Sequence, residues 1–148
     1  MSPQPIHILV VEDNEDDIFL IREAFREARL ANSFSVVRDG VEALEYLRGA
    51  GKHADAASPG LVLLDINMPK KNGFEVLKEI KDDPELRHLP VVMLTTSDAE
   101  SDIVRSYANG ACSYITKPVD FPAFRDVVRQ FALYWTLVSR IPGRPELE

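Results

Sequence analysis

The sequence has little of what would place it in a membrane or in an oxidising compartment. No apolar run approaches the ~20 residues that a membrane-spanning helix needs. The N-terminus lacks the basic region of a secretory signal, and its first apolar run, residues 8–11, is far too short for one. The single cysteine, Cys112, has no partner for an internal disulfide, which agrees with a reducing compartment. We therefore expect a cytoplasmic protein.

The chain is also short of positive charge, with 17 Lys and Arg against 24 Asp and Glu and a net charge of -7. A surface of that sign repels phosphate backbones and anionic lipids, so nucleic acid and membranes are poor candidate partners. The 148 residues, 45% of them hydrophobic, are enough for one domain with a real core. We expect a single domain over residues 1–148, with flexible ends at residues 1–5 and 141–148.

Five short apolar runs, rich in β-branched residues, predict the strands of a sheet. They cover residues 6–11, 34–38, 61–65, 90–95 and 112–116. The third begins with four apolar residues in a row, which is typical of a strand covered on both faces of a parallel sheet. Cys112 is expected to be buried in the last of these strands.

Between these runs, apolar residues recur at spacings of three and four, as they do in helices that cover a sheet. The recurring residues are Ile18, Ile21 and Phe25, then Phe74, Leu77 and Ile80, and finally Phe124, Val128 and Phe131. Strands that alternate with helices predict an α/β protein, a (βα)5 fold with a doubly wound, five-stranded parallel sheet.

Polar side chains follow the predicted strands at the point where each strand ends. Glu12 and Asp13 follow the first, Asp65 ends the third, Thr95 ends the fourth and Lys117 follows the fifth. Sites in open parallel sheets form outside the carboxyl ends of the strands, so we expect these residues to lie together. Three neighbouring carboxylates repel one another and favour a divalent cation, and oxygen ligands suit Mg²⁺.

The same set of residues suits phosphoryl transfer. A carboxylate can attack phosphorus and form an aspartyl phosphate, while a metal ion and a lysine neutralise charge on the transferred group. Asp65 is the best candidate nucleophile because it follows a buried strand, and Lys117 is the best fixed cation. Taken singly, Glu12 and Asp13 could simply open a helix, and Lys117 could lie in a solvated turn. These plain readings must all hold at neighbouring strand ends to explain the whole set.

Four segments in order resemble the CheY-like response-regulator receiver family, over nearly all of residues 6–137. They read LVVED at 9–13, LDINMP at 64–69 with Gly73, VMLT at 92–95 and YITKP at 114–118. The resemblance implies a flavodoxin-like receiver fold and a two-component phosphorelay function. Asp65 would accept a phosphoryl group from a sensor histidine kinase and thereby switch protein–protein contacts. The protein would assist its own Mg²⁺-dependent phosphorylation and dephosphorylation without being an enzyme in the usual sense.

The resemblance also implies a role for each site residue. Glu12 and Asp13 would form the acidic pair, with Asp13 and Asp65 directly on the Mg²⁺ ion and with Asn67 contributing its backbone carbonyl. The remaining roles are the phosphoryl contacts of Thr95 and Lys117, the aromatic switch of Tyr114, and the tuning of phosphoryl lifetime by Asn67 and Ser97.

Residues 16–17, 64–73 and 94–97 are similar to the stand-alone receivers that serve bacteriophytochromes. This resemblance implies that the partner kinase is a bacteriophytochrome. With no output domain expected, the protein would act through contacts with other proteins.

Two other functions fit the same architecture. A phosphatase with an aspartyl-phosphate intermediate commonly has a second acid two residues after the nucleophile, whereas that position here is Asn67, which cannot give a proton. A flavodoxin-like cofactor-binding module would need a turn rich in Gly, Ser or Thr after the first strand, to hold phosphate on backbone amides. Residues 12–17 are instead strongly acidic.

The end of the last predicted helix is too apolar for one buried stripe, because a helix on a sheet should leave its opposite face polar. The apolar residues in excess are Tyr134, Trp135, Leu137 and Val138. We expect them to form the surface of a homodimer, since a symmetric pair is the commonest way to cover such a patch. The alternatives are that the helix folds back onto its own domain or binds the kinase.

Overall fold

The computed structural model describes residues 7–27, 33–96, 99–117 and 121–133, and within them it shows a five-stranded parallel sheet. The strand order is β2-β1-β3-β4-β5. The strands are β1 (His7–Val11), β2 (Ser33–Val37), β3 (Leu61–Leu64), β4 (Val91–Thr95) and β5 (Ser113–Thr116). The predicted α/β fold is confirmed, and the strand ends differ from the predicted ends by one residue at most.

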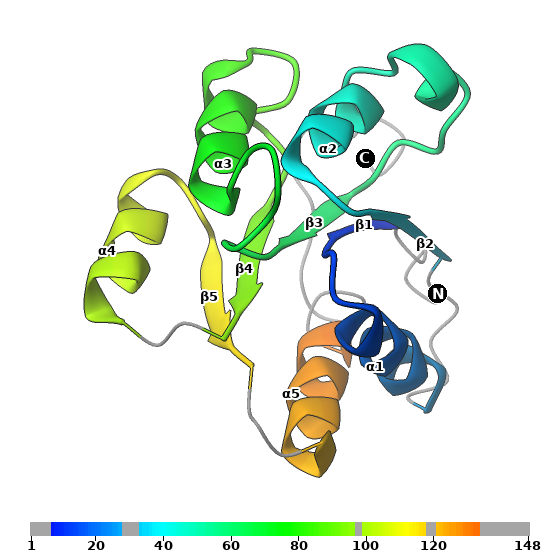
Figure 1. Ribbon diagram of the computed structural model, residues 1–148, viewed down its shortest axis with the longest axis vertical. Coiled ribbons are helices and arrows are strands. Elements are labelled where there is room, and N and C mark those ends of the chain that lie inside the picture. Colours follow the sequence, from blue (N-terminus) through cyan, green and yellow to red (C-terminus); the bar gives the residue numbers. More distant parts are fainter. Residues whose placement is uncertain (1–6, 28–32, 97–98, 118–120, 134–148) are drawn as a thin grey trace, which may run out of the picture.

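Helices cover both faces of this sheet (Figure 1). Their bounds are α1 (Glu15–Glu27), α2 (Gly40–Leu47), α3 (Gly73–Asp82), α4 (Glu100–Ala108) and α5 (Phe121–Leu133). A short 3-10 helix, Gly51–His53, lies in the long connection between α2 and β3. Helices α1 and α5 pack together on one face, whereas α2 and α3 lie together on the other. None of the helices in the described residues combines the length and the apolar character that spanning a membrane requires.

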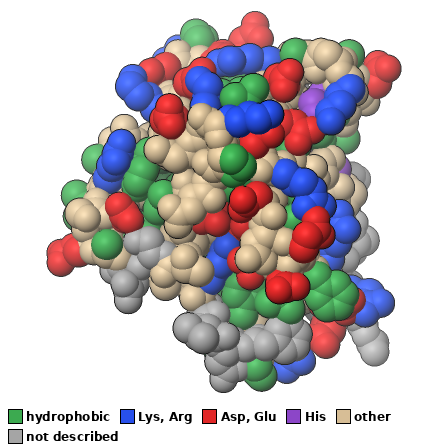
Figure 2. Space-filling view, in the orientation of Figure 1, with side chains coloured by type: hydrophobic (Ala, Val, Ile, Leu, Met, Phe, Trp, Pro, Cys, Tyr) green, Lys and Arg blue, Asp and Glu red, His purple; other side chains and the backbone are tan. Residues whose placement is uncertain are grey.

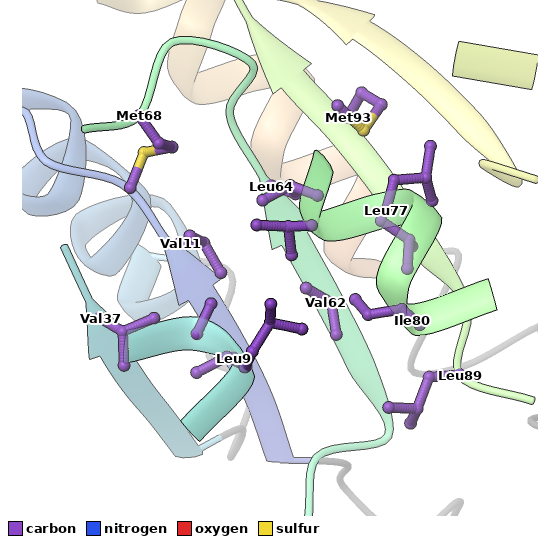
Figure 3. Close-up of a cluster of buried hydrophobic side chains, with 14 of the residues drawn as sticks. Leu9, Val11, Val37, Val62, Leu64, Met68, Leu77, Ile80, Leu89 and Met93 are labelled. Carbon is purple, nitrogen blue, oxygen red and sulfur yellow. The ribbon is translucent and has the colours of Figure 1, made fainter. Parts of the chain in front are cut away.

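The core has two halves because side chains alternate between the faces of each strand. On β1, Leu9 and Val11 contribute to the half under α2 and α3, where Leu77 and Ile80 meet them (Figure 3). Ile8 and Val10 belong to the other half, with the helix residues Ile21, Phe25 and Phe124. The predicted apolar stripes are thus confirmed where they are described, while the side chains of Val128 and Phe131 lie outside the described set.

Polar side chains cap the starts of α1 and α3. Asn14 accepts a hydrogen bond on its side chain from the backbone N–H of Asp17 at 3.0 Å, at the start of α1. Asn72 and Glu75 form a reciprocal capping box at the start of α3, which satisfies two backbone donors that the helix leaves open. The cap of α1 matters for the site because this helix begins only four residues after the end of β1.

The prediction that Cys112 is buried in a strand is wrong. The strand begins one residue later, at Ser113, and Cys112 is exposed. Its thiol donates to the carbonyl oxygen of Val91 at 3.4 Å, so the residue continues the edge of the sheet without entering the core.

Candidate functional site

Side chains from three strand ends and one helix meet at the carboxyl edge of the sheet. Glu12 and Asp13 follow β1, Asp65 follows β3, Lys117 follows β5, and Asp17 lies in the first turn of α1. Figure 2 shows acidic side chains gathered near the middle of the face on which Figure 1 shows the strands ending. The prediction that these residues lie together at one edge of the sheet is therefore confirmed for Glu12, Asp13, Asp65 and Lys117.

The Lys117 ammonium lies at the centre of this group. Its Nζ donates to Glu12 Oε1, to Asp17 Oδ2 at 2.8 Å and to Asp65 Oδ2 at 3.4 Å. The side chains of Lys117 and Glu12 are each only 3% exposed, so this pair is largely out of water. The alternative of a solvated turn at Lys117 is wrong.

Burial and charge act on Glu12 and Lys117 in different ways. Burial raises the pKa of Glu12 to about 7, and the charge of Asp65 adds to this, although Lys117 opposes it. Burial alone would lower the pKa of Lys117, but the charge of Glu12, the hydrogen bond to Asp17 and the charge of Asp65 together raise it. The site therefore favours the charged ammonium form of Lys117, whereas it disfavours the ionised form of the Glu12 carboxyl.

Backbone contacts hold Asp65 in place. Its N–H donates to the carbonyl oxygen of Val11 at 3.2 Å, which continues the pairing of β1 with β3 beyond the strand. The backbone N–H of Asn67 donates to Asp65 Oδ1 at 3.4 Å. Gly73 packs so closely below this turn that a Cβ atom would lie 2.4 Å from the carbonyl oxygen of Asp65.

The close approach of Gly73 gives a testable prediction. Alanine is normally favoured over glycine in a helix, yet the Gly73→Ala side chain would also meet the Cα of Ile66 at 2.8 Å. Because both neighbours are backbone, the turn must move, and we expect a loss of about 1–3 kcal/mol in the free energy of unfolding. Urea denaturation measures this, with the exposed Lys78→Ala in the same helix as control. A Gly73→Ala protein as stable as the wild type would contradict the close packing.

Three carboxylates are arranged so that they could share a cation. One oxygen from each of Glu12, Asp13 and Asp65 lies within 4.8 Å of the others. Counting Asp17, which pairs with Lys117, the cluster holds four carboxylates and one ammonium, which leaves three negative charges in excess when all are ionised. The all-oxygen donor set and this charge fit a hard divalent cation.

Thr95 and Tyr114 lie on the neighbouring strands β4 and β5, and the backbone N–H of Lys117 donates to the carbonyl oxygen of Thr95 at 2.7 Å. Thr95 is fully buried at the end of β4, and its hydroxyl oxygen is the single buried side-chain oxygen or nitrogen atom without a hydrogen-bond partner among the described residues. Tyr114 on β5 is partly buried and packs against the core half under α2 and α3. Since Met93 pairs with Tyr114 and Thr95 with Thr116, the Thr95 and Tyr114 side chains project from the same face of the sheet.

One member of the cluster, Asp17, was not predicted from the sequence, and several predicted residues lie outside the described part of the chain. The sequence pattern marks Asp17 only within the acidic run 12–17 and the receiver-like residues 16–17, although its spacing of four from the buried Ile21 indicates the face that meets the sheet. Outside the described residues lie Ser97, the two ends predicted to be flexible, and the predicted dimer surface of Tyr134, Trp135, Leu137 and Val138. These stay predictions.

Comparison with known families gives one match over most of the chain. The model of the response regulator receiver domain matches residues 8–129. The response regulator Rcp1 of a Synechocystis species is 36% identical over 142 residues, which cover 96% of this chain and 97% of Rcp1.

Solved structures show the same similarity in three dimensions. The phosphorylated cyanobacterial phytochrome response regulator RcpA superimposes with a TM-score of 0.90 at 43% identity, covering 95% of this chain and 100% of RcpA. A Mn²⁺-bound form of Rcp1 gives a TM-score of 0.89 at 36% identity, with coverage of 94% and 100%. The bacteriophytochrome response regulator AtBRR superimposes with a TM-score of 0.72 at 42% identity, covering 93% of this chain and 100% of AtBRR. The chain therefore belongs to the response-regulator receiver family, the regulators of two-component signalling.

Proposed function

We propose that Asp65 accepts a phosphoryl group from a sensor histidine kinase and that Lys117 pairs with the group after transfer. The observation that supports this most directly is the buried Lys117 ammonium, held 3.4 Å from Asp65 Oδ2 in a group of carboxylates at the strand ends. A fixed cation beside a fixed carboxylate is the arrangement that phosphoryl transfer to an aspartate requires.

The transfer forms one bond and breaks one. A carboxylate oxygen of Asp65 attacks the phosphorus, and the bond from phosphorus to the donor breaks, so that the leaving group departs with the electron pair. Lys117 then donates to a phosphoryl oxygen, and Thr95 has a buried hydroxyl available for another. Both contacts exist only once the group has arrived, and they therefore favour the phosphorylated state.

We further propose that the cation is Mg²⁺, held by Asp13, Asp65 and the backbone carbonyl of Asn67, with Glu12 close by. When bound, Mg²⁺ would neutralise charge on the phosphoryl oxygens. The excess of negative charge in the cluster supports a divalent ion at this place, and the Mn²⁺-bound form of Rcp1 supports it by similarity.

Incubation of the protein with acetyl phosphate tests this function. We expect a phosphoprotein that forms with Mg²⁺ present and does not form after chelation with EDTA, detected by intact mass. Continuous release of phosphate without a lasting phosphoprotein would favour the phosphatase alternative. That alternative lacks its acid, because Asn67 stands two residues after Asp65. No labelling at any Mg²⁺ concentration would reject the proposal.

The partner that we propose is a phytochrome-linked sensor histidine kinase. RcpA and AtBRR are phytochrome response regulators, and both align with nearly the whole of this chain. Transfer of phosphate to this protein from a kinase of that class, faster than from an unrelated histidine kinase, is the expected result.

Phosphorylation would act on Thr95 and Tyr114 as a switch. We propose that the phosphoryl group draws the Thr95 hydroxyl towards Asp65 and changes the position of Tyr114 on the neighbouring strand. The exposed side chain of Asn67 next to Asp65, together with Ser97, would set how quickly water removes the phosphoryl group.

Thr95→Val separates the switch from phosphoryl acceptance. Valine has nearly the same shape, and the hydroxyl it replaces is buried without a partner, so we expect stability to change by less than about 1 kcal/mol. Labelling of Asp65 should persist, whereas the phosphorylation-induced shift of the Tyr114 ring resonances should largely disappear. A full shift in Thr95→Val would show that another residue couples the two sites.

A further inference from the structure

Asp17 makes a closer contact with Lys117 than the proposed nucleophile does. Asp17 Oδ2 accepts from Lys117 Nζ at 2.8 Å, whereas Asp65 Oδ2 lies at 3.4 Å. The Asp17 side chain is 22% exposed. Its backbone is fixed by the Asn14 cap and by the burial of Ile18 and Ile21 beneath α1. The contact therefore joins a rigid helix start to the end of β5.

The Lys117 ammonium has only as many N–H donors as it has carboxylate partners. A lysine ammonium has three N–H donors and no acceptor. In this structure Glu12, Asp17 and Asp65 are its three partners. Two donors engage the closer carboxylates of Glu12 and Asp17, which leaves the third directed at Asp65 across the longer contact.

We propose that Asp17 is a positioning residue, which together with Glu12 holds the Lys117 ammonium so that its third N–H meets the phosphoryl group on Asp65. This inference rests on the proposed function of Asp65. Without Asp17, the flexible lysine side chain would move closer to the carboxylate of Asp65 and shorten the 3.4 Å contact with Oδ2. The nucleophile would then be masked before transfer, and the phosphoryl oxygens would be poorly placed for Lys117 after it.

A plainer role for Asp17 is to stabilise the start of α1 through the helix dipole. Acidic side chains favour a helix N-terminus, and the first turn of α1 holds Glu15, Asp16 and Asp17. Asp16 is exposed, lies in the same turn and has the same charge. Asp16→Ala is thus a matched control, because it removes an equal charge from the same turn.

Phosphorylation rates of three variants separate these roles. At saturating Mg²⁺ and acetyl phosphate, we expect Asp17→Ala to react about tenfold more slowly than the wild type, the effect of losing one charge-assisted hydrogen bond in the transition state. Asp17→Asn keeps an oxygen acceptor at the same place and should recover most of the rate. Asp16→Ala should react like the wild type.

A second measurement observes Lys117 without any phosphorylation. Lysine ammonium groups that are buried and hydrogen-bonded exchange slowly enough to give a ¹H–¹⁵N signal, so Lys117 Nζ should be visible in the wild type. The signal should vanish or shift strongly in Asp17→Ala and persist in Asp17→Asn and Asp16→Ala, with folding of each variant confirmed by thermal unfolding.

The outcomes distinguish the two proposals. If the wild type is labelled normally and Asp17→Ala has an unchanged rate and Nζ signal, the positioning role is wrong while the proposed function stands. Equal slowing in Asp17→Asn and Asp17→Ala would also overturn positioning, because the retained oxygen would have had no effect. A wild type that takes no label rejects the function of Asp65 itself, and this inference with it.

Discussion

Asp65→Asn is expected to reduce Mg²⁺-dependent phosphoryl labelling to background. The amide has nearly the same shape but lacks the anionic oxygen that attacks phosphorus, and it offers a divalent cation one neutral oxygen in place of a charged one. Intact mass after incubation with acetyl phosphate measures the result. Asp16→Asn, an exposed change of the same kind in the first turn of α1, is the control and should label normally.

The loss of labelling in Asp65→Asn should not arise from unfolding. Asp65 is 7% exposed and lies in a cluster with excess negative charge, where its own charge raises the pKa of Glu12. Removing that charge relieves repulsion, while Lys117 keeps its two closer partners. We therefore expect Asp65→Asn to unfold at the wild-type temperature or above it. Labelling of the variant, mapped to another residue, would reject Asp65 as the acceptor.

Lys117→Met is expected to cause the largest loss of stability among the site variants. Methionine fills a similar volume but leaves Glu12, which is 2% exposed, without its cation. Removing one partner of a buried ion pair costs about 3–5 kcal/mol in the free energy of unfolding, because the remaining charge is uncompensated. Urea denaturation measures this loss, and Lys78→Met, which breaks the exposed pair with Asp82, is the control and should change stability little.

The loss of stability in Lys117→Met should depend on pH, and the raised pKa of Glu12 determines whether it grows or shrinks as pH rises. The folded-state pKa of Glu12 is raised from 4.5 to about 7, so its neutral form is favoured in the fold and stability is lost as pH rises from 4.5 through 7. Without Lys117, the fold loses more stability over the same rise in pH, because no cation offsets the ionised Glu12. The ammonium of Lys117, with its raised pKa, remains fully charged throughout this range in the wild type.

Measurements at two pH values therefore check the assignment. The stability difference between wild type and Lys117→Met should be large at pH 8 and should shrink towards pH 5, where Glu12 can take up a proton. Mg²⁺ at pH 8 should restore part of the lost stability, because a cation at the carboxylates replaces some of the missing charge. A difference that is independent of pH and Mg²⁺ would show that lost packing, rather than charge, explains the effect.

The sequence by itself was sufficient to predict the parallel sheet, the alternation of strands and helices along the chain, and the edge where the polar residues meet. The run LVLL at β3 is buried at every position, and such a run is typical of a strand in the middle of a parallel sheet. Once the strands were known, the convergence of Glu12, Asp13, Asp65 and Lys117 followed, because the carboxyl ends of parallel strands lie at one edge.

Only the tertiary structure decided how these residues share charge. Lys117 and Asp17 are 100 residues apart, and their contact depends on where α1 begins relative to the end of β5. Likewise, the unpaired hydroxyl of Thr95 and the close approach of Gly73 to the carbonyl of Asp65 depend on distances of a few ångströms between elements. Residue spacing specifies which face or edge a side chain occupies, whereas its partners and its pKa are set by packing between segments that are remote in the chain.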